Sequence, residues 1–326
     1  MKILITGGAG YIGSHIAEEF SKNNQVIIVD NLSTGYQKLL FKKIKFYKLD
    51  IRKTTELKKI IIKERINIVV HLAAKLSLQE AQKKPKQYFS NNVNGTKSVL
   101  KAIHNSYVKT IIFSSTAAVY SGNKEIACKE NLKPKPINLY GKTKLISEEL
   151  IKKFCKKNKI KSIILRYFNV VGASKSGKIG SIKNYGQLFK ILSKSVIKKK
   201  PKINVYGNDH KTPDGTCVRD FIDINDIVSI HSLIINKKEK IKNGTIINCG
   251  YGKGFSILDV ISSFEKVARK KIKIKFLKKR YKEISNIYAD NTLIKDILKW
   301  KPKYKDLRVS IKRCLNWEKK LKNVQR

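Results

Sequence analysis

Three polar residues in the middle of the chain have the types and spacing of an acid–base site. Tyr140 and Lys144 stand four residues apart in the run Tyr140-Gly-Lys-Thr-Lys144, and residues at this spacing share one face of a helix. Thr116 ends the run Ser114-Ser115-Thr116. A phenol, an amine and a hydroxyl placed together can take a proton from a substrate alcohol. We therefore predict Tyr140, Lys144 and Thr116 as catalytic residues.

This chemistry requires Tyr140 to lose its proton near neutral pH. A free tyrosine has a pKa of about 10, so it is a poor base at pH 7. A nearby ammonium and any further positive charge in the site favour the phenolate. Lowering the pKa by roughly 3 units requires about 4 kcal/mol. We expect Lys144 to supply much of this free energy and Thr116 to hydrogen-bond the reacting hydroxyl; the alternative is a Tyr/Lys pair on a helix surface.

Alternating strands and helices in the first half would hold these residues in place. The predicted strands are Lys2–Thr6, Val26–Val29, Lys45–Lys48, Ile66–His71, Thr110–Ser114 and Ser162–Arg166. The predicted helices are Gly13–Asn23, Thr54–Arg65, Tyr88–Asn105 and Tyr140–Lys157. This rhythm indicates an α/β fold, a doubly wound parallel sheet of the Rossmann type with helices on both faces. Thr116 then lies at the carboxyl end of a central strand, where such sheets bind ligands.

The second half is less regular. Helices are predicted over Gln187–Lys199, Asp223–Ile235, Ser256–Arg269 and Asn291–Leu298, with a short strand at Ile203–Tyr206. We predict a Rossmann domain over residues 1–168, which the chain re-enters around 219–235. A smaller α/β domain over residues 169–326 would bind the substrate.

A glycine-rich run follows the first strand and opens the first helix. Gly7, Gly10 and Gly13 are spaced G-x-x-G-x-x-G, with Tyr11 and Ile12 inside the run. Glycine lets the backbone approach a pyrophosphate, and the helix N-terminus offers free N–H groups to the anion. A flexible turn is the alternative, but a strand followed by glycines and a helix is the context that a dinucleotide requires.

Acidic residues after the next two strands indicate which dinucleotide binds. Asp30, followed by Asn31, can accept hydrogen bonds from an adenosine ribose and would repel a 2′-phosphate. No arginine lies near it in the sequence, which favours NAD over NADP. Asp50, followed by Ile51, is placed to hold the adenine amino group. A helix-capping role for Asp30 and a loop role for Asp50 are the alternatives.

Composition limits the other classes of function. The formal net charge of the 326-residue chain is +47, which by itself favours an anionic partner such as nucleic acid or a membrane. The basic residues are mostly lysines spread along the whole chain, so we expect no specific nucleic-acid or membrane partner, only steering of an anionic substrate. The five cysteines are far apart and show no metal-binding spacing. With no leader or apolar span recognised, we expect a cytoplasmic protein without a metal.

Together these motifs resemble the extended short-chain dehydrogenases, and within them the UDP-galactose 4-epimerases. The segments that carry the resemblance are Thr6–His15, Asp30–Ser33, His71–Ala74, Asn91–Thr96, Phe113–Tyr120, Tyr140–Lys144, Arg166–Ala173, Gly207–Asp209, Asp214–Phe221 and Asn248–Gly252. The resemblance implies interconversion of UDP-glucose and UDP-galactose by inversion at C4. A transient 4-keto sugar would form while bound NAD accepts the hydride and returns it.

The resemblance also implies roles for individual residues. The implied NAD contacts, besides those above, are Leu72, Ala73, Ala74, Asn91, Ser114, Tyr140, Lys144 and Tyr167. The implied UDP-sugar contacts are Thr116, Tyr140, Asn169, Gln187, Val205, Tyr206, Arg219, Arg280 and Glu283. Helices Tyr88–Asn105 and Tyr140–Lys157 would form a homodimer interface.

Several departures from the family pattern leave alternatives open. Lys75 lacks the usual spacing for a substrate contact, and Glu283 stands in an unusual context after Arg280. Ile287 aligns with the gate of the hexose pocket and is intermediate in size, so UDP-GlcNAc and UDP-GalNAc are alternative substrates. A sugar-nucleotide dehydratase is less favoured because Ala117 and Ala118 follow Thr116 where dehydratases carry acids. A non-catalytic basic scaffold that binds NAD or nucleic acid is the remaining alternative.

Overall fold

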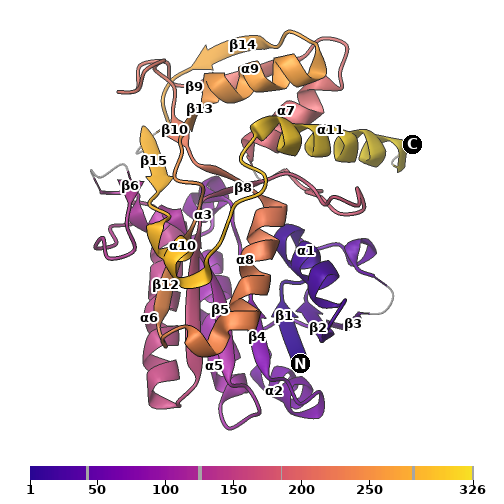
Figure 1. Ribbon diagram of the computed structural model, residues 1–326, viewed down its shortest axis with the longest axis vertical. Coiled ribbons are helices and arrows are strands. Elements are labelled where there is room, and N and C mark those ends of the chain that lie inside the picture. The colour runs from indigo at the N-terminus through magenta and orange to yellow at the C-terminus, as the bar shows by residue number, and fades with distance from the viewer. Residues whose placement is uncertain (42–43, 124–126, 185, 281–282, 325–326) are drawn as a thin grey trace. The chain divides into compact units, whose positions relative to one another are not determined.

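A computed structural model describes residues 1–41, 44–123, 127–184, 186–280 and 283–324 (Figure 1). The chain divides into two compact units, each described by itself below. Unit 1 consists of Met1–Ser121, Lys133–Tyr167 and Ile230–Ile247. Unit 2 consists of Gly122–Leu132, Phe168–Ser229 and Asn248–Arg326.

A seven-stranded sheet forms the centre of unit 1, in the order β12-β7-β5-β4-β1-β2-β3. The strands are β1 (Lys2–Thr6), β2 (Gln25–Asp30), β3 (Lys45–Lys48), β4 (Ile68–His71), β5 (Thr110–Thr116), β7 (Lys161–Tyr167) and β12 (Thr245–Cys249). The pairs β1–β2, β1–β4, β2–β3, β4–β5 and β5–β7 are all parallel. Because the order runs outward from β1 in both directions, the sheet is doubly wound, and the predicted fold class is confirmed.

Helices cover both faces of this sheet. The helices of unit 1 are α1 (Tyr11–Phe20), α2 (Thr54–Lys63), α3 (Leu78–Lys83), α4 (Pro85–Tyr88), α5 (Gly95–Ile103), α6 (Leu139–Lys157) and the second part of α8 (Ile224–Lys237). Its short helical turns are η1 (Gln37–Leu39), η2 (Phe89–Asn94), η3 (Ala117–Tyr120) and η4 (Lys238–Lys240). Leu57 of α2, Val99 of α5 and Ile151 of α6 are buried in one cluster with Leu4 of β1. Ile3 points to the opposite face and is equally buried, and α1 contacts β1 and β2.

The structure divides the helix predicted over Tyr88–Asn105. Helix α4 ends at Tyr88, a π-helical turn η2 follows over Phe89–Asn94, and α5 begins at Gly95. π-Helical turns are rare and occur frequently at functional sites. The other predicted helices match observed ones to within a few residues, whereas β12 and α11 (Leu307–Val324) were not predicted.

Unit 2 is built from small sheets and an apolar helix cluster. Its strands are β6 (Ala127–Cys128), β8 (Asn169–Val171), β9 (Lys202–Tyr206), β10 (Val218–Arg219), β11 (Phe221–Asp223), β13 (Phe255–Ser256), β14 (Lys273–Leu277) and β15 (Asn286–Ala289). Its helices include α7 (Leu188–Val196), α9 (Ile257–Ala268), α10 (Thr292–Leu298) and α11. The strands form sheets β13-β10-β15-β6, β11-β8 and β14-β9. Phe189 of α7, Phe264 of α9 and Ile311 of α11 share one core.

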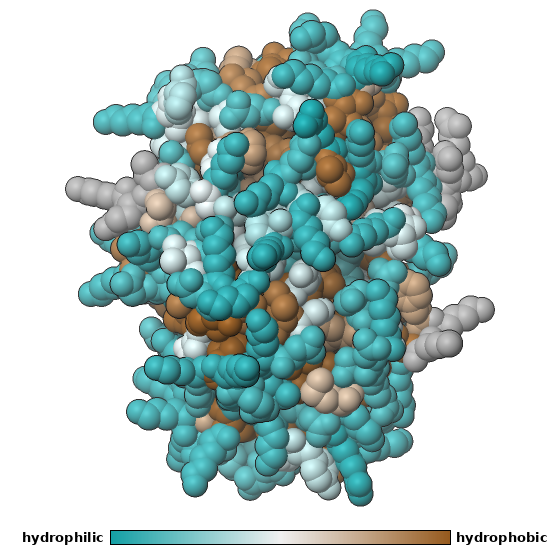
Figure 2. All heavy atoms as spheres, in the orientation of Figure 1, coloured by the Kyte–Doolittle hydropathy of each residue, from teal (hydrophilic) through white to brown (hydrophobic). Residues whose placement is uncertain are grey.

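The surface is dominated by hydrophilic side chains. Figure 2 shows them over most of the visible face, with apolar side chains lying between and beneath them. Only two lysines among the described residues are recorded as buried, Lys144 and Lys190. The excess positive charge is therefore carried mostly at the surface. In the described part of the chain no helix is both long enough and apolar enough to cross a membrane.

Candidate active site

The glycine run forms a tight loop between β1 and α1. The N–H of Gly7 donates to the carbonyl oxygen of Val29 (2.9 Å). Gly7 has φ +72°, and a Cβ atom there would lie 2.7 Å from the nitrogen of Ala73. A Cβ on Gly13 would lie 2.4 Å from the carbonyl oxygen of Gly7. Glycine is therefore required at both positions by close backbone contacts.

The first turn of α1 is open to an anion. Gly10 is the N-cap and has no side chain to satisfy the first N–H groups of the helix, and no acidic residue lies in the first turn. Tyr11 and Ile12 begin the helix. Free N–H groups and the helix dipole together make such a terminus an anion-binding site. The loop therefore fits the pyrophosphate of a dinucleotide.

The carboxylate predicted to bind the ribose lies at the end of β2 against this loop. Asp30 accepts hydrogen bonds from the backbone N–H groups of Ala9 (3.1 Å) and Leu32 (2.8 Å). Burial raises the pKa of Asp30, and these two hydrogen bonds oppose the rise. Asp30 therefore also helps to hold the loop in shape.

The neighbouring acid, Asp50, belongs to a separate polar cluster. Its carboxylate accepts from the Arg52 guanidinium (2.9 and 2.8 Å) and from the Asn31 amide (3.0 Å). The hydrogen bonds from Arg52 hold the pKa of Asp50 well below its usual range. Arg52 also donates to the Ser90 hydroxyl (3.1 Å). Ile51, predicted as a cofactor contact, is buried in the core of unit 1.

The segment after β4 is tied to the π-helical turn. The N–H of Leu72 donates to the carbonyl oxygen of Thr6 (3.0 Å). The amide of Asn92 accepts from the N–H of Lys75 (2.9 Å) and from the side chain of Asn91 (3.1 Å). The ammonium of Lys75 is paired with Glu80 (3.2 Å). The side chain of Asn91, a predicted NAD contact, is thus held by the Asn92 side chain, which Lys75 fixes in turn. The π-helical turn and this role of Asn92 were not predicted from the sequence.

The predicted catalytic residues lie together at the carboxyl end of β5. Thr116 is the last residue of that strand, and its hydroxyl hydrogen-bonds that of Tyr140. Lys144, one turn further along α6, donates to the carbonyl oxygen of Ser114 (2.6 Å). The side chain of Asn138 caps α6 by accepting from the N–H of Gly141 (2.8 Å), and this cap fixes where Tyr140 enters the helix.

Burial shifts the pKa values of this cluster, and the pKa of Tyr140 moves in the opposite direction to the one expected from the sequence. Burial raises the pKa of Tyr140 to about 12, although the hydrogen bond with Thr116 opposes the rise. Burial lowers the pKa of Lys144 to about 7, partly offset by the charge of Glu148. In the chain alone, Lys144 therefore does not depress the tyrosine pKa as expected, because Lys144 is buried, Tyr140 is partly buried, and burial disfavours each charged form.

A buried ion pair next to the predicted catalytic cluster was not predicted from the sequence. The guanidinium of Arg166 donates to both carboxylate oxygens of Glu148 (3.0 and 2.6 Å) and to the Tyr120 hydroxyl (2.7 Å). The Ser115 hydroxyl donates to the same carboxylate. Burial lowers the pKa of Arg166, but the bonds to Glu148 outweigh it and hold that pKa above its ordinary value. Glu148 follows Lys144 by four residues, so helical spacing was the available signal.

Tyr167, predicted as a cofactor contact, ends β7. Its hydroxyl lies 3.0 Å from Nε2 of His231 in α8, and both side chains are buried. This contact joins the sheet of unit 1 to the part of α8 that belongs to the same unit. His231 was not singled out from the sequence because a lone histidine on a helix carries no motif.

The predicted substrate contacts all lie in unit 2, apart from Thr116 and Tyr140. Asn169 begins β8 and is exposed, and its N–H donates to the carbonyl oxygen of Asp220 (2.9 Å). Gln187 is the N-cap of α7. Val205 in β9 is buried in the apolar core of the unit.

Three of the predicted substrate residues lie together, in two contacts that share Arg280. The guanidinium of Arg280 lies 3.9 Å from the centre of the Tyr206 ring and 3.6 Å from the carboxylate of Glu283. Arg219 donates to the carbonyl oxygens of Val218 (2.8 Å) and of the residue before β15 (3.4 Å). An arginine stacked on an aromatic ring beside a carboxylate can bind a planar base and a sugar hydroxyl. Arg219 also pairs in register with Ile287 on β15.

Asp220 holds this part of unit 2 together. Its buried carboxylate accepts from the backbone N–H groups of Tyr251 (2.9 Å), Gly252 (2.9 Å) and Ala289 (3.2 Å). Burial raises its pKa to about 6 against these hydrogen bonds. Asp220, the residue after Arg219, thus fixes the loops around Arg219. This is a structural reason for the Arg-Asp order in the sequence.

The doubly wound sheet, the glycine loop and the Tyr140–Lys144 pair define a protein of the short-chain dehydrogenase class. A sequence model of the NAD-dependent epimerase/dehydratase family matches residues 3–250. The chain belongs to this family, and the expected NAD dependence and resemblance to 4-epimerases are confirmed.

Relatives of known name match along almost the whole chain. A UDP-glucose 4-epimerase from Lactobacillus helveticus is 37% identical over 98% of this chain and 97% of its own. A probable UDP-arabinose 4-epimerase from Oryza sativa subsp. japonica is 35% identical over 97% of this chain and 82% of its own.

Solved structures agree with this assignment. The UDP-glucose 4-epimerase from Stenotrophomonas maltophila, with bound NAD and formylated UDP-arabinopyranose, superposes with a TM-score of 0.94 at 30% identity over 99% of each chain. The UDP-glucose 4-epimerase from Bifidobacterium longum, in complex with NAD+ and UDP, superposes with a TM-score of 0.92 at 32% identity over 99% of each chain. The UDP-Glc/GlcNAc 4-epimerase from Campylobacter jejuni superposes with a TM-score of 0.85 at 34% identity, covering 98% of this chain and 99% of its own.

Proposed function

We propose that this protein is a UDP-glucose 4-epimerase, which interconverts UDP-glucose and UDP-galactose by inversion at C4. The observation that carries the proposal is the convergence of Thr116, Tyr140 and Lys144 at the carboxyl end of β5, where the Lys144 ammonium donates to the carbonyl oxygen of Ser114 (2.6 Å). A partly buried phenol beside a second hydroxyl suits proton transfer at a sugar alcohol. When bound, NAD supplies the acceptor and donor of the C4 hydride and, in its oxidised form, a positive charge.

Side chains of the protein would transfer the proton to and from the sugar O4. Tyr140 accepts that proton as the 4-keto sugar forms and returns it after the ring has turned over. Thr116 hydrogen-bonds both the phenol and the sugar hydroxyl and so aligns the transfer. Lys144 is held by the carbonyl oxygen of Ser114 (2.6 Å). Because burial leaves Tyr140 protonated in the chain alone, its phenolate requires further positive charge in the site.

We assign the two ligands to different units. Unit 1 would hold NAD through Gly7, Gly10 and Gly13 on the pyrophosphate and Asp30 on the adenosine ribose. The further NAD contacts proposed are Tyr11, Ile12, Asn31, Asp50, Ile51, Leu72, Ala73, Ala74, Asn91, Ser114, Tyr140, Lys144 and Tyr167. The buried position of Ile51 supports an apolar contact at most, since its side chain faces the core.

Unit 2 would hold the UDP part of the substrate. Tyr206 and Val205 form one wall of the uracil site, and Arg219 and Arg280 bind the pyrophosphate by charge-assisted hydrogen bonds. Glu283, beside Arg280 (3.6 Å), accepts from ribose hydroxyls. Asn169 and Gln187 are the remaining proposed contacts. Firm binding of UDP together with loose binding of the sugar lets the 4-keto ring turn over.

The experiment is conversion of UDP-galactose by the purified protein without added NAD, followed by chromatography. We expect UDP-glucose to form, because tightly held NAD purifies with the enzyme. Tyr140→Phe should lower kcat by roughly 10²- to 10⁴-fold with UDP binding unchanged. The matched control is Tyr107→Phe, since Tyr107 is exposed. No turnover by a wild-type protein that binds UDP and NAD would refute the proposal.

A second candidate is a 4-epimerase that also accepts UDP-GlcNAc and UDP-GalNAc. Ile287 favours it, because this branched residue of intermediate size pairs in register with Arg219, a proposed pyrophosphate ligand. Comparable turnover of UDP-galactose and UDP-GalNAc would establish dual specificity. Ile287→Tyr should then lose UDP-GalNAc activity and keep UDP-galactose activity. A dehydratase is less supported, since Ala117 and Ala118 after Thr116 carry no acid.

We also propose a homodimer and a cytoplasmic location. Phe89 in η2 and Ile146 in α6 are large apolar side chains with exposures of 42% and 36%, on the two segments predicted to form the interface. Light scattering should give a dimer, and the double variant Phe89→Lys with Ile146→Lys should give monomers. All five cysteines are buried thiols that form no disulfide, which suits a reducing compartment.

A further inference from the structure

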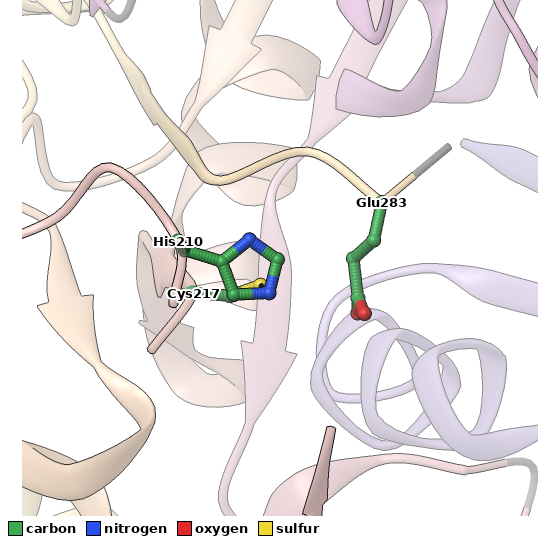
Figure 3. A group of neighbouring side chains, drawn as sticks. All are labelled: His210, Cys217 and Glu283. Carbon is green, nitrogen blue, oxygen red and sulfur yellow. Dashed lines mark hydrogen bonds between the residues drawn. The ribbon is translucent and has the colours of Figure 1, made fainter. Parts of the chain in front are cut away.

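Three metal-binding side chains converge in unit 2 from separate segments. His210 follows β9, Cys217 immediately precedes β10, and Glu283 lies between β14 and β15. One ligand atom from each lies within 4.8 Å of the other two (Figure 3). His210 and Cys217 are buried, and Glu283 is partly buried. The 66-residue separation of Cys217 and Glu283 explains why no spacing motif revealed this cluster.

The imidazole of His210 is held in the orientation that a metal ligand needs. Its Nδ1 lies 3.2 Å from the Ser285 hydroxyl, and its Nε2 lies 3.3 Å from Sγ of Cys217. If Nδ1 carries the proton and donates it to Ser285, the lone pair of Nε2 points toward the sulfur. Metal-binding histidines almost always donate their second N–H to such an outer partner.

Glu283 supplies the observation that a simple thiol–imidazole hydrogen bond leaves unexplained. Its Oε2 atom is buried and has no hydrogen-bond partner among the described residues. Its other oxygen is only loosely paired, 3.6 Å from the Arg280 guanidinium. A buried carboxylate oxygen without a partner is destabilising unless a ligand satisfies it.

We propose that His210, Cys217 and Glu283 bind one zinc-class divalent cation, with a fourth position left for water. Zinc accepts sulfur, imidazole nitrogen and carboxylate oxygen at about 2.0 to 2.3 Å in tetrahedral geometry. Ligand atoms around such an ion are therefore about 3.3 to 3.7 Å apart. The Nε2–Sγ distance of 3.3 Å already meets this spacing, and a small rotation of the Glu283 side chain completes it. Binding displaces the thiol proton of Cys217 to solvent.

Occupation of this site would oppose UDP binding. This step rests on the proposed function, in which Glu283 accepts from the ribose of UDP. One carboxylate cannot serve both ligands in the same geometry, so the ion and the nucleotide bind in competition. A ribose hydroxyl alone would also satisfy Glu283, but it needs neither the thiol nor the oriented imidazole.

The test is titration of the purified full chain with Co²⁺, whose bond to a thiolate gives a charge-transfer absorption band. We expect a band that saturates at one ion per chain, that Zn²⁺ abolishes, and that is absent in Cys217→Ala. Cys314→Ala is the matched control, since Cys314 is a buried cysteine of the same unit, and it should keep the band. Ser285→Ala should keep the band with roughly 10- to 100-fold weaker binding. His210→Gln should weaken it more.

Each outcome separates the metal site from the proposed function. A wild-type chain that gives no band, or a band that survives Cys217→Ala, overturns the metal site. Thermal unfolding of each variant shows that it is folded, and Glu283→Gln offers a second, nearly isosteric probe with the thiol intact. UDP, whose own binding is measured by calorimetry, should weaken Co²⁺ binding at least tenfold; an unchanged affinity overturns the competition. Failure of UDP to bind at all would count against the proposed function and leave the Co²⁺ result standing.

Discussion

The ammonium of Lys144 lies 2.6 Å from the carbonyl oxygen of Ser114, at the point where α6 passes the end of β5. The carbonyl dipole and the Phe113 ring, 4.6 Å from the same nitrogen, are its neighbours. Neither carries a full negative charge, and Glu148 contributes only at a distance. Burial therefore decides the protonation of Lys144 and lowers its pKa to about 7.

The first prediction concerns the pH dependence of stability. Lys144 has a lower pKa folded than unfolded, so between pH 7 and about 10.5 the unfolded chain binds more protons. The free energy of unfolding should therefore rise with pH across this window. Lys144→Met should remove about 5 kcal/mol of that rise, measured by urea unfolding at several pH values. Lys142→Met is the matched control, because Lys142 is exposed on the same helix. A rise equal to that of the wild type in Lys144→Met would contradict this account.

The second prediction concerns the hydroxyl of Thr116. Thr116→Val keeps the shape of the side chain but removes the hydrogen bond with Tyr140. We expect kcat for UDP-galactose to fall about 10²-fold with KM little changed, since alignment matters most in the transition state. Thr116→Ser retains the hydroxyl and should stay within a few-fold of the wild type. Equal losses in the two variants would point to packing of the methyl group instead.

The third prediction separates two reasons for glycine at position 7. Gly7 has φ +72° and no room for a Cβ, which would lie 2.7 Å from the nitrogen of Ala73. Gly244 in the same unit has φ +79° but open space around it. Gly244→Ala should cost about 1 kcal/mol through its backbone conformation alone. Gly7→Ala should cost more and should also reduce the NAD content of the purified protein, measured by absorbance after denaturation. Equal effects of the two changes would show that the close approach to Ala73 is unimportant.

The fourth prediction concerns the buried ion pair of Glu148 and Arg166. Glu148→Gln leaves the buried guanidinium without its charged partner, and we expect about 3 to 5 kcal/mol of destabilisation in denaturant unfolding. The control is Glu19→Gln, which removes an exposed pair with Lys22 and should cost less than about 1 kcal/mol. The double change Glu148→Leu with Arg166→Met should recover much of the stability. If it does not, the hydrogen bonds from Ser115 to Glu148 and from Arg166 to Tyr120 matter more than the pairing of charge.

Local patterns in the sequence were enough to predict the class of fold and the grouping of Thr116, Tyr140 and Lys144. The strand–glycine–helix opening, the acid at the end of β2 and the Tyr140–Lys144 spacing each depend on neighbours within a few residues, where backbone geometry is set by local sterics. Helix α11 could have been found in the same way, since Leu307, Ile311 and Leu315 recur every four residues and are all buried. Its lysine-rich polar face obscured this stripe.

Tertiary structure alone decided the features that depend on distant partners. The edge strand β12 is a strand because it pairs with β7, and the π-helical turn is stabilised by contacts of Asn92 with Lys75 and Thr143. The direction of the Tyr140 pKa depends on burial, which no spacing reveals. The cluster of His210, Cys217 and Glu283 has the same origin, since hydrogen bonding between strands and burial of apolar surface bring together residues that chain order keeps apart.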